Sequence, residues 1–253
     1  MSTAHEQLVA QKFGPRATAY VASAVHAQGA DLDRLVEIVR NHPQARVLDL
    51  GCGGGHVSFH VAPHVQEVVA YDLTTDMLAA VEKVAAERKL ANIMTRQEAA
   101  EDLPFVTGSF DLVLSRYSAH HWHGFPRALA EAARVLKKGG IAVFMDVVAP
   151  GNALLDTYLQ TVELLRDPSH VRDYSNEEWM QAIADAGFTP KALVERRLRL
   201  EFLSWVERIA TPGTHTQAIR SLQEQMSVDV ATHFEIEPDG TFTVDTITFE
   251  LSH

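Results

Sequence analysis

The sequence predicts an α/β fold in which helices cover both faces of a mostly parallel sheet. Short apolar runs alternate with amphipathic helical segments from about residue 31 to residue 148. This alternation is typical of parallel sheets, whose strands are buried on both faces. A glycine-rich turn follows the first predicted strand, and an acidic residue ends the second. In open sheets of this kind, ligands bind at the carboxyl ends of the strands.

Each element of this core follows from a local signal. The first helix carries apolar residues at helical spacing and ends before Pro43. Thr74 or Thr75 is placed to cap a later helix, and Pro126 suits the first turn of another. KKGG at residues 137–140 supplies a helix stop. The predicted strands are residues 45–50, 67–72, 93–96, 110–115 and 141–148. The main helices are residues 31–42, a helix after Thr74 or Thr75 with Met77, Leu78, Val81 and Val84 on its apolar face, and about 126–136.

The pattern changes after residue 150, where a helical insertion follows the fifth strand. Ser175 and Glu178 form a capping-box pair for a helix that ends at Gly187. A strand near residues 192–200, helical segments to about 226 and an alternating strand at 241–251 complete the chain. We therefore expect one domain over residues 1–253. It would comprise an N-terminal cap at 1–30, a ligand-binding core at about 45–148 and an insertion or lid at about 150–187.

Composition and charge favour a small-molecule partner. The net charge is −11 and no long basic run occurs, so nucleic acid and anionic membrane surfaces are poor partners. No apolar run reaches the length of a membrane span, and the N-terminus lacks the features of a signal peptide. Cys52 is the single cysteine, which excludes an intramolecular disulfide and fits a cytoplasmic location. The oligomeric state stays open.

The glycine turn, GCGGG at residues 51–55, indicates a ligand that approaches the backbone closely, because glycine has no Cβ. The dinucleotide fingerprint would place a third glycine where this chain has His56. Asp49 precedes the turn and is expected to orient it. Asp72 ends the next strand, where an acid can accept both hydroxyls of a ribose.

At this point the sequence resembles the class I S-adenosylmethionine-dependent methyltransferases. It is most similar to the small-molecule group that includes the ubiquinone/menaquinone C-methyltransferases, the methyltransferase type 11 group. The segments that carry the resemblance are VLDLGCGGGH, VVAYDLTTDML, AAEDLPF, GSFDLVLSRYSAHHW and ARVLKKGG. It continues through RDPSHVRDYSNEEW, which resembles an uncharacterised enterobacterial methyltransferase-like group.

The resemblance implies a Rossmann-like, seven-stranded sheet and S-adenosyl-L-methionine as cofactor, with S-adenosyl-L-homocysteine as product. In the family the glycines approach the methionine and ribose, the acid binds the ribose, and an N-terminal aromatic closes over the cofactor. Where the family has an adenine-binding Asp, this chain has Ala99, so backbone groups there would take over. The implied cofactor residues are Tyr20, Gly51, Cys52, Gly53, Gly55, Asp72, Leu73, Met77, Ala99, Ala100, Glu101 and Ser115.

The stretch RYSAHHWHGF, residues 116–125, follows the fourth strand and should line the site beside the sulfonium. Three crowded histidines without a cysteine make a poor zinc site, so we expect no metal. His120 or His121 is the candidate base, because histidine titrates near neutral pH, while Trp122 packs into the fold. A purely structural role for these histidines is the alternative. The candidate substrate-binding residues are Arg116, Tyr117, His170, Arg172 and Tyr174.

The favoured function is methyl transfer to an oxygen or carbon of a small phenol- or enol-like acceptor. A protein that binds S-adenosylmethionine without catalysis, such as a sensor, is an alternative from another class. A nicotinamide-dependent oxidoreductase is a further alternative, against which His56 counts because it replaces the third dinucleotide glycine. The identity of the acceptor and the atom that is methylated cannot be inferred from these patterns.

Overall fold

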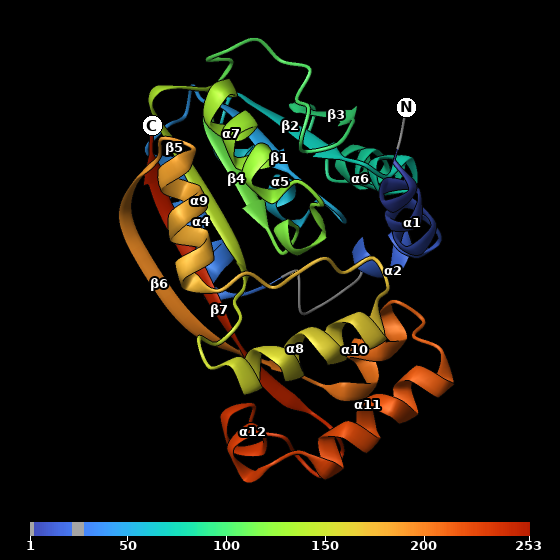
Figure 1. The fold of residues 1–253 in the computed structure, drawn as a ribbon. Helices are drawn as coiled ribbons and strands as arrows, with labels where there is room; N and C mark the ends of the chain where they lie inside the picture. The colour runs from blue at the N-terminus through green and yellow to red at the C-terminus, as the bar shows by residue number, and fades with distance from the viewer. Residues whose placement is uncertain (1–2, 22–27) are drawn as a thin grey trace.

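A seven-stranded sheet with the order β3-β2-β1-β4-β5-β7-β6 forms the centre of the molecule (Figure 1). The computed structural model describes residues 3–21 and 28–253. Strands β1 to β5 run parallel, and β7 lies antiparallel between β5 and β6. The predicted fold class is confirmed. The strands are β1 Arg46–Leu50, β2 Glu67–Asp72, β3 Ile93–Gln97, β4 Phe110–Arg116, β5 Leu136–Val147, β6 Thr189–Leu200 and β7 Phe242–Ser252.

Helices cover both faces because successive side chains of a strand point to opposite sides. In β1, Val47 packs with helices α4 and α5, whereas Leu48 and Leu50 pack with α7 and α9. Helix α6 lies on the same face as α5, against Ala70 of β2. The helices are α4 Ala30–Arg40, α5 His56–Val61, α6 Thr75–Glu87, α7 Phe125–Val135 and α9 Asn176–Asp185.

Helix α7 ends at Val135, close to the predicted end, but the KKGG segment that follows does not form its C-cap and lies inside the long strand β5. Leu136 already pairs with Phe110 of β4, and the register then shifts before Leu112 pairs with Ile141. Gly139 has a φ of 76°, and its N–H donates to the carbonyl of His253 at 2.7 Å. The glycines therefore form an irregularity in a strand, because the N–H of Gly139 and the carbonyl of Gly140 both pair with the backbone of His253.

A second group of helices packs beyond the carboxyl-terminal ends of the central strands (Figure 1). We call this group the cap; it is distinct from the N-terminal segment expected at residues 1–30. The cap consists of α8 Ala153–Arg166, α10 Phe202–Arg208, α11 Gly213–Gln225 and α12 Val228–His233. Helix α12 was not expected from the sequence. The segment expected as one insertion at 150–187 is divided, since α8 joins the cap while α9 packs on the sheet through Trp179 and Ile183. The capping box of Ser175 and Glu178 at the start of α9 is confirmed.

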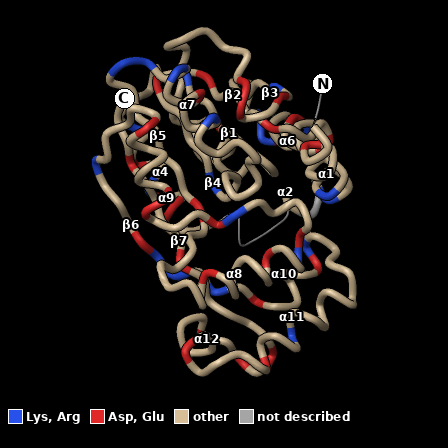
Figure 2. Tube along the Cα trace, in the orientation of Figure 1, with Lys and Arg blue, Asp and Glu red and all other residues tan. Residues whose placement is uncertain are grey.

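The N-terminal segment forms α1 Ala4–Phe13, a 3₁₀ turn η1 Gly14–Arg16 and α2 Ala17–Val21, and it lies beside α6. Basic and acidic residues alternate along the trace (Figure 2), so the described chain offers no continuous basic track. None of its helices combines the length and the apolar character that crossing a membrane requires.

Gly55 provides a test of how tightly the turn after β1 packs. Its φ is 80°, and a Cβ there would lie 2.8 Å from Val81 and 2.9 Å from Phe59. Gly187 has a similar φ of 84° but nothing within 4 Å. We expect Gly55→Ala to lower the free energy of unfolding by about 2–5 kcal/mol, and Gly187→Ala by about 1–2 kcal/mol. Urea unfolding measures both, and equal losses would contradict the packing described.

Candidate active site

A cavity of about 1550 Å³, including its open mouth, lies between the carboxyl ends of the strands and the cap. Its walls come from the loops after β1, β2 and β4, from α1 and α2, and from α8 and α10. The sequence predicted this location from the parallel strand pattern. The walls nevertheless include cap residues that the sequence did not single out, among them Glu163, Arg166, Trp205 and Arg208.

The glycine turn forms the wall at the end of β1. The N–H groups of Gly51 and Cys52 both donate to the carbonyl of Tyr71, at 2.8 and 2.9 Å, and fold the turn against β2. Gly53 has a φ of 49°, and a Cβ at this position would meet nothing within 4 Å. Its backbone is therefore open to a ligand. Gly55 lies beneath the turn as the N-cap of α5 and does not line the cavity.

Asp72 joins the turn after β1 to the turn after β2. Its Oδ2 accepts from the N–H of Gly53 at 2.8 Å, and its Oδ1 accepts from the N–H of Thr74 at 2.8 Å. Burial raises the pKa of this carboxyl, and the two N–H groups oppose the rise. Leu73 and Met77 follow on the same wall. The predicted acid is therefore fixed at the cavity by two loops.

Asp49 has one carboxylate oxygen in use and one without a partner. Its Oδ2 accepts from the N–H and the hydroxyl of Ser58, at 2.9 and 2.6 Å. Its buried Oδ1 has no hydrogen-bond partner in the part of the chain that the structure describes. Burial raises the pKa of Asp49 to about 7. Because this residue also lines the cavity, a cationic group of a ligand would find an acceptor here.

The loop after β3 presents backbone to the cavity at Ala99 and Ala100. The hydroxyl of Tyr71 donates to the carbonyl of Ala99 at 2.9 Å and fixes this backbone. Glu101 also lines the cavity, but its Oε1 accepts from the N–H of Gly124 at 3.0 Å and lies 3.0 Å from Nδ1 of His123. Its carboxylate is thus already engaged by Gly124 and His123.

The end of β4 leads into a short 3₁₀ turn, η3 Ala119–His121. Ser115 is buried within the strand, opposite Phe144, and does not line the cavity. Arg116 and Tyr117 do line it, and Nε of Arg116 lies 2.5 Å from Oδ2 of Asp31. This buried ion pair fixes the chain immediately before the histidines.

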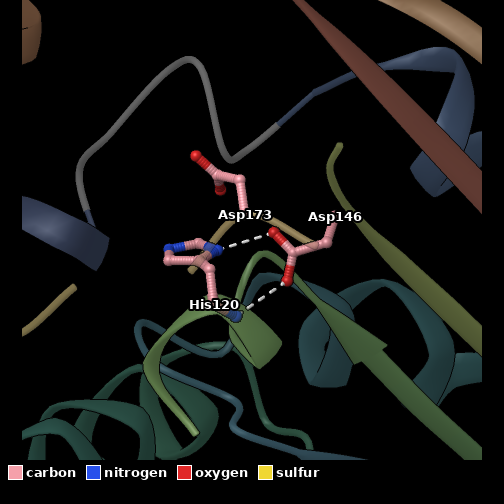
Figure 3. Close-up of side chains that lie close together, drawn as sticks. All are labelled: His120, Asp146 and Asp173. Carbon is pink, nitrogen blue, oxygen red and sulfur yellow. Dashed lines mark hydrogen bonds and ion pairs between the residues drawn. The ribbon is translucent and has the colours of Figure 1, made fainter. Parts of the chain in front are cut away.

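His120 is paired with Asp146, a buried acid near the end of β5 (Figure 3). The ring Nδ1 lies 2.6 Å from Oδ1 of Asp146, and the backbone N–H of His120 donates to Oδ2 at 3.3 Å. The sequence analysis missed Asp146, although an acid within an otherwise apolar strand is itself a signal. Burial opposes a charge on His120, but Asp146 and then Asp173 outweigh it and raise the pKa of the imidazole to about 9.

Asp173 lies beside the same ring, with its carboxylate pointing away from Asp146 (Figure 3). Its Oδ2 is buried and has no hydrogen-bond partner among the described residues. Burial raises the pKa of Asp173 well above its ordinary value, and burial likewise raises the pKa of Glu163. One ligand atom each from His120, Asp146 and Asp173 lie within 4.8 Å of one another, close enough to share a cation.

The other histidines of the stretch have different surroundings. Nδ1 of His121 lies 3.1 Å from the carbonyl of Ser169, and burial together with His120 lowers the pKa of His121 to about 3. Trp122 is buried and its Nε1–H donates to the hydroxyl of Ser118 at 3.1 Å. The crowded histidines therefore do not converge on one point.

The segment between α8 and α9, residues 167–175, crosses over η3, and we call it the strap. The N–H groups of Val171 and Arg172 both donate to the carbonyl of His120, at 2.9 and 3.3 Å. His170 is bonded to Gln160 and Arg172 to Glu178 and Asp156, while Tyr174 stacks on Phe125 at 4.0 Å. His170, Arg172 and Tyr174 are absent from the described cavity lining, and their contacts serve to hold the strap.

Tyr20 of α2 lines the cavity from the N-terminal side and packs on Phe13 with ring centroids 5.3 Å apart. Burial raises the pKa of its phenol, and the nearby cations Arg166 and Arg208 oppose the rise. The N-terminal aromatic expected at the cavity is therefore there, and it faces the cap.

Comparisons with known proteins agree with this architecture. A model described as a methyltransferase domain matches residues 48–144. The uncharacterized protein YafE of Escherichia coli K12 is 48% identical over 78% of this chain and 95% of its own. The uncharacterized methyltransferase YcgJ of Bacillus subtilis is 34% identical over 82% of each chain. A crystal structure of a putative methyltransferase from Bacillus halodurans superimposes with a TM-score of 0.85 at 30% identity, over 88% of this chain and 99% of that one.

The residues present fit the cofactor of that family. The open space beside Gly53 allows close approach to the backbone, Asp72 can accept from ribose hydroxyls, and the unpartnered oxygen of Asp49 suits an ammonium group. The family model, the sequence relative and the solved structure all indicate a methyltransferase. The chain belongs to the class I S-adenosyl-L-methionine-dependent methyltransferases.

Proposed function

We propose that this methyltransferase acts on a small acceptor with an ionisable phenol- or enol-like group, and that His120 removes the acceptor's proton. The observation that carries the proposal is the pairing of His120, which lines the cavity after β4, with Asp146, which is buried near the end of β5. When bound, S-adenosyl-L-methionine supplies a methyl group activated by a positive sulfur. What the protein adds is orientation, exclusion of water and a base.

The cofactor would lie along the loops after β1, β2 and β3. The turn at residues 51–54 would contact the methionine and ribose, with Cys52 as a small residue of the wall, while Gly55 would support the turn from below. Asp72 would accept from the ribose hydroxyls, and Leu73 with Met77 would pack on the adenine. The backbone of Ala99 and Ala100, held by the Tyr71 hydroxyl, would replace the side chain that the family uses for the adenine amine.

His120 is a better base than His121 in these surroundings. Asp146 occupies Nδ1 of His120 and leaves Nε2 as the nitrogen that can meet an acceptor. The raised pKa of about 9 is close to that of a phenol, which is where proton transfer is efficient. The pKa of His121, lowered to about 3, makes it a weak base. His121 would then shape the pocket.

The acceptor class can be tested with a panel that includes phenols, enols, amines and thiols, with S-adenosyl-L-homocysteine release as the readout. Turnover restricted to phenols or enols supports the proposal, and turnover of amines alone would contradict it.

His120→Ala should reduce turnover by about 10²–10⁴-fold, as expected for loss of a general base. His120 must be neutral to accept a proton, so wild-type turnover should rise with pH and level off above about 9. The variant should recover part of its activity at high pH, where the acceptor ionises unaided. Turnover against pH measures both effects.

His121→Ala is the matched control, and thermal melts of both variants exclude unfolding. Cofactor affinity should change little in either variant. Normal folding with near-normal turnover across pH in both would show that neither histidine is the base.

Asp72→Ala should weaken S-adenosyl-L-homocysteine binding by about 1–3 kcal/mol, because hydrogen bonds to a charged acceptor are lost. Asp76→Ala removes the same charge from an exposed position four residues away and should leave affinity unchanged. Calorimetry on both folded variants measures this, and an unaltered affinity in Asp72→Ala would refute the ribose role.

Activity should survive chelators, because His120 and Asp146 would take part in proton transfer and would not bind a metal. The test is turnover after dialysis against EDTA, together with metal analysis of the purified protein. A stoichiometric metal whose removal abolishes turnover, and whose content falls in Asp173→Asn, would show that the cluster of His120, Asp146 and Asp173 holds a cation.

A further inference from the structure

Two arginines of the cap line the cavity, Arg166 at the end of α8 and Arg208 at the end of α10. Neither was singled out in the sequence, because they lie far apart in the chain and in separate helices. Both line one cavity, Arg166 is close enough to lower the pKa of Arg208, and Tyr20 interacts with both. The cap therefore brings two guanidinium groups and a phenol to one part of the wall.

Arg166 is buried and held in place. Its Nε–H donates to the carbonyl of Trp205 at 3.0 Å, its guanidinium lies 4.9 Å from the indole ring, and Nη1 lies 3.4 Å from Glu163. Glu163 offsets the charge of Arg166. The group is thus oriented before any ligand arrives.

Arg208 differs because its charge has no direct partner and is offset only in part, through space, by Tyr20 and Glu163. It is half-buried, and the described residues provide its side chain with neither a hydrogen-bond nor an ion-pair partner. Burial and then the neighbouring Arg166 lower its pKa. A guanidinium that loses water without gaining a partner is unfavourable, and an anionic ligand would remove that cost through bidentate hydrogen bonds.

The surroundings define the rest of the ligand. Val147, Leu198, Leu200 and Trp205 line the same cavity and provide an apolar surface. The acids Glu163 and Asp173 lie on the wall as well, so a singly charged oxyanion is repelled less than a doubly charged one. A carboxylate therefore fits better than a phosphate.

We propose that the methyl acceptor is an amphipathic acid whose carboxylate binds Arg208 and Arg166 while its apolar body lies against Leu198, Leu200 and Trp205. This rests on the proposed function, since it names the substrate class for the same cavity. The acceptor's reacting group would then face His120, which lines the cavity together with the cap residues.

The cofactor's own carboxylate is the competing occupant. The methionine end of the cofactor is expected beside Gly51 and Asp49, and the cation that acts on Asp49 is Arg116, not a cap arginine. The cap arginines belong to α8 and α10, which the family match at residues 48–144 does not reach. The two carboxylates would therefore bind to different cations.

The test is an NMR titration of the protein saturated with S-adenosyl-L-homocysteine, using benzoate, phenyl phosphate and phenol as probes. We expect benzoate to bind most tightly, phenyl phosphate more weakly, and phenol most weakly. Arg208→Gln should reduce benzoate affinity about 10- to 100-fold, as for loss of a charged hydrogen-bonded pair, and leave phenol affinity unchanged. Arg208→Lys keeps the positive charge but loses the bidentate geometry of the guanidinium, so its benzoate affinity should be intermediate.

Arg40→Gln, which removes an exposed charge at the end of α4, is the matched control and should change nothing. Equal binding of benzoate and phenol, no benzoate binding, or full benzoate affinity in Arg208→Gln would each overturn the proposal. Loss of S-adenosyl-L-homocysteine affinity in Arg208→Gln would also overturn it, because the two cap arginines would then bind the cofactor and not the acceptor. Failure of the folded wild-type protein to bind S-adenosyl-L-homocysteine would instead contradict the cofactor site itself.

Discussion

The bonds from Asp72 to the backbone of Gly53 and Thr74 are the constraint on which the active site depends. They connect two loops that leave neighbouring parallel strands, so the wall that would hold the cofactor is one rigid unit. The carbonyl of Tyr71 supports the same turn by accepting hydrogen bonds from the N–H groups of Gly51 and Cys52. Because the turn is built from backbone contacts, its glycines matter through the side chains they lack, as the open space beside Gly53 illustrates.

The carboxylate of Asp146 divides the roles of the two adjacent histidines. His120 and His121 are neighbours in the chain and both are largely removed from water. The carboxylate of Asp146 in direct contact favours the charged form of His120, whereas His121 meets a backbone carbonyl and the charge of its neighbour. The pKa values of about 9 and about 3 separate the two rings into a strong and a weak base.

Local patterns located the wall of the cavity formed by the strand loops better than the wall formed by the cap. Gly53 and Asp72 could be located because strand ends in a parallel sheet meet at one edge, so distant segments are placed by geometry alone. No comparable rule locates Glu163 or Arg208, since an amphipathic helix in a cap indicates a buried face without indicating its neighbour. The helix end before KKGG was predicted, but the place of KKGG in β5 was not, because the partner of Gly139, the carbonyl of His253, lies more than a hundred residues away.

Helix α1 closes one side of the cavity without burying any side chain completely. Its contacts with η3 include the pair of His5 with the carbonyl of His121 and the packing of Phe13 on the ring of His121. Local opening is governed by the apolar surface and hydrogen bonds that must be given up. The strap, in contrast, is tied to η3 and α9 by backbone bonds and ion pairs. Displacement of α1 would therefore give up less buried surface and fewer hydrogen bonds than displacement of the strap, so these contacts favour exchange of ligands on the α1 side.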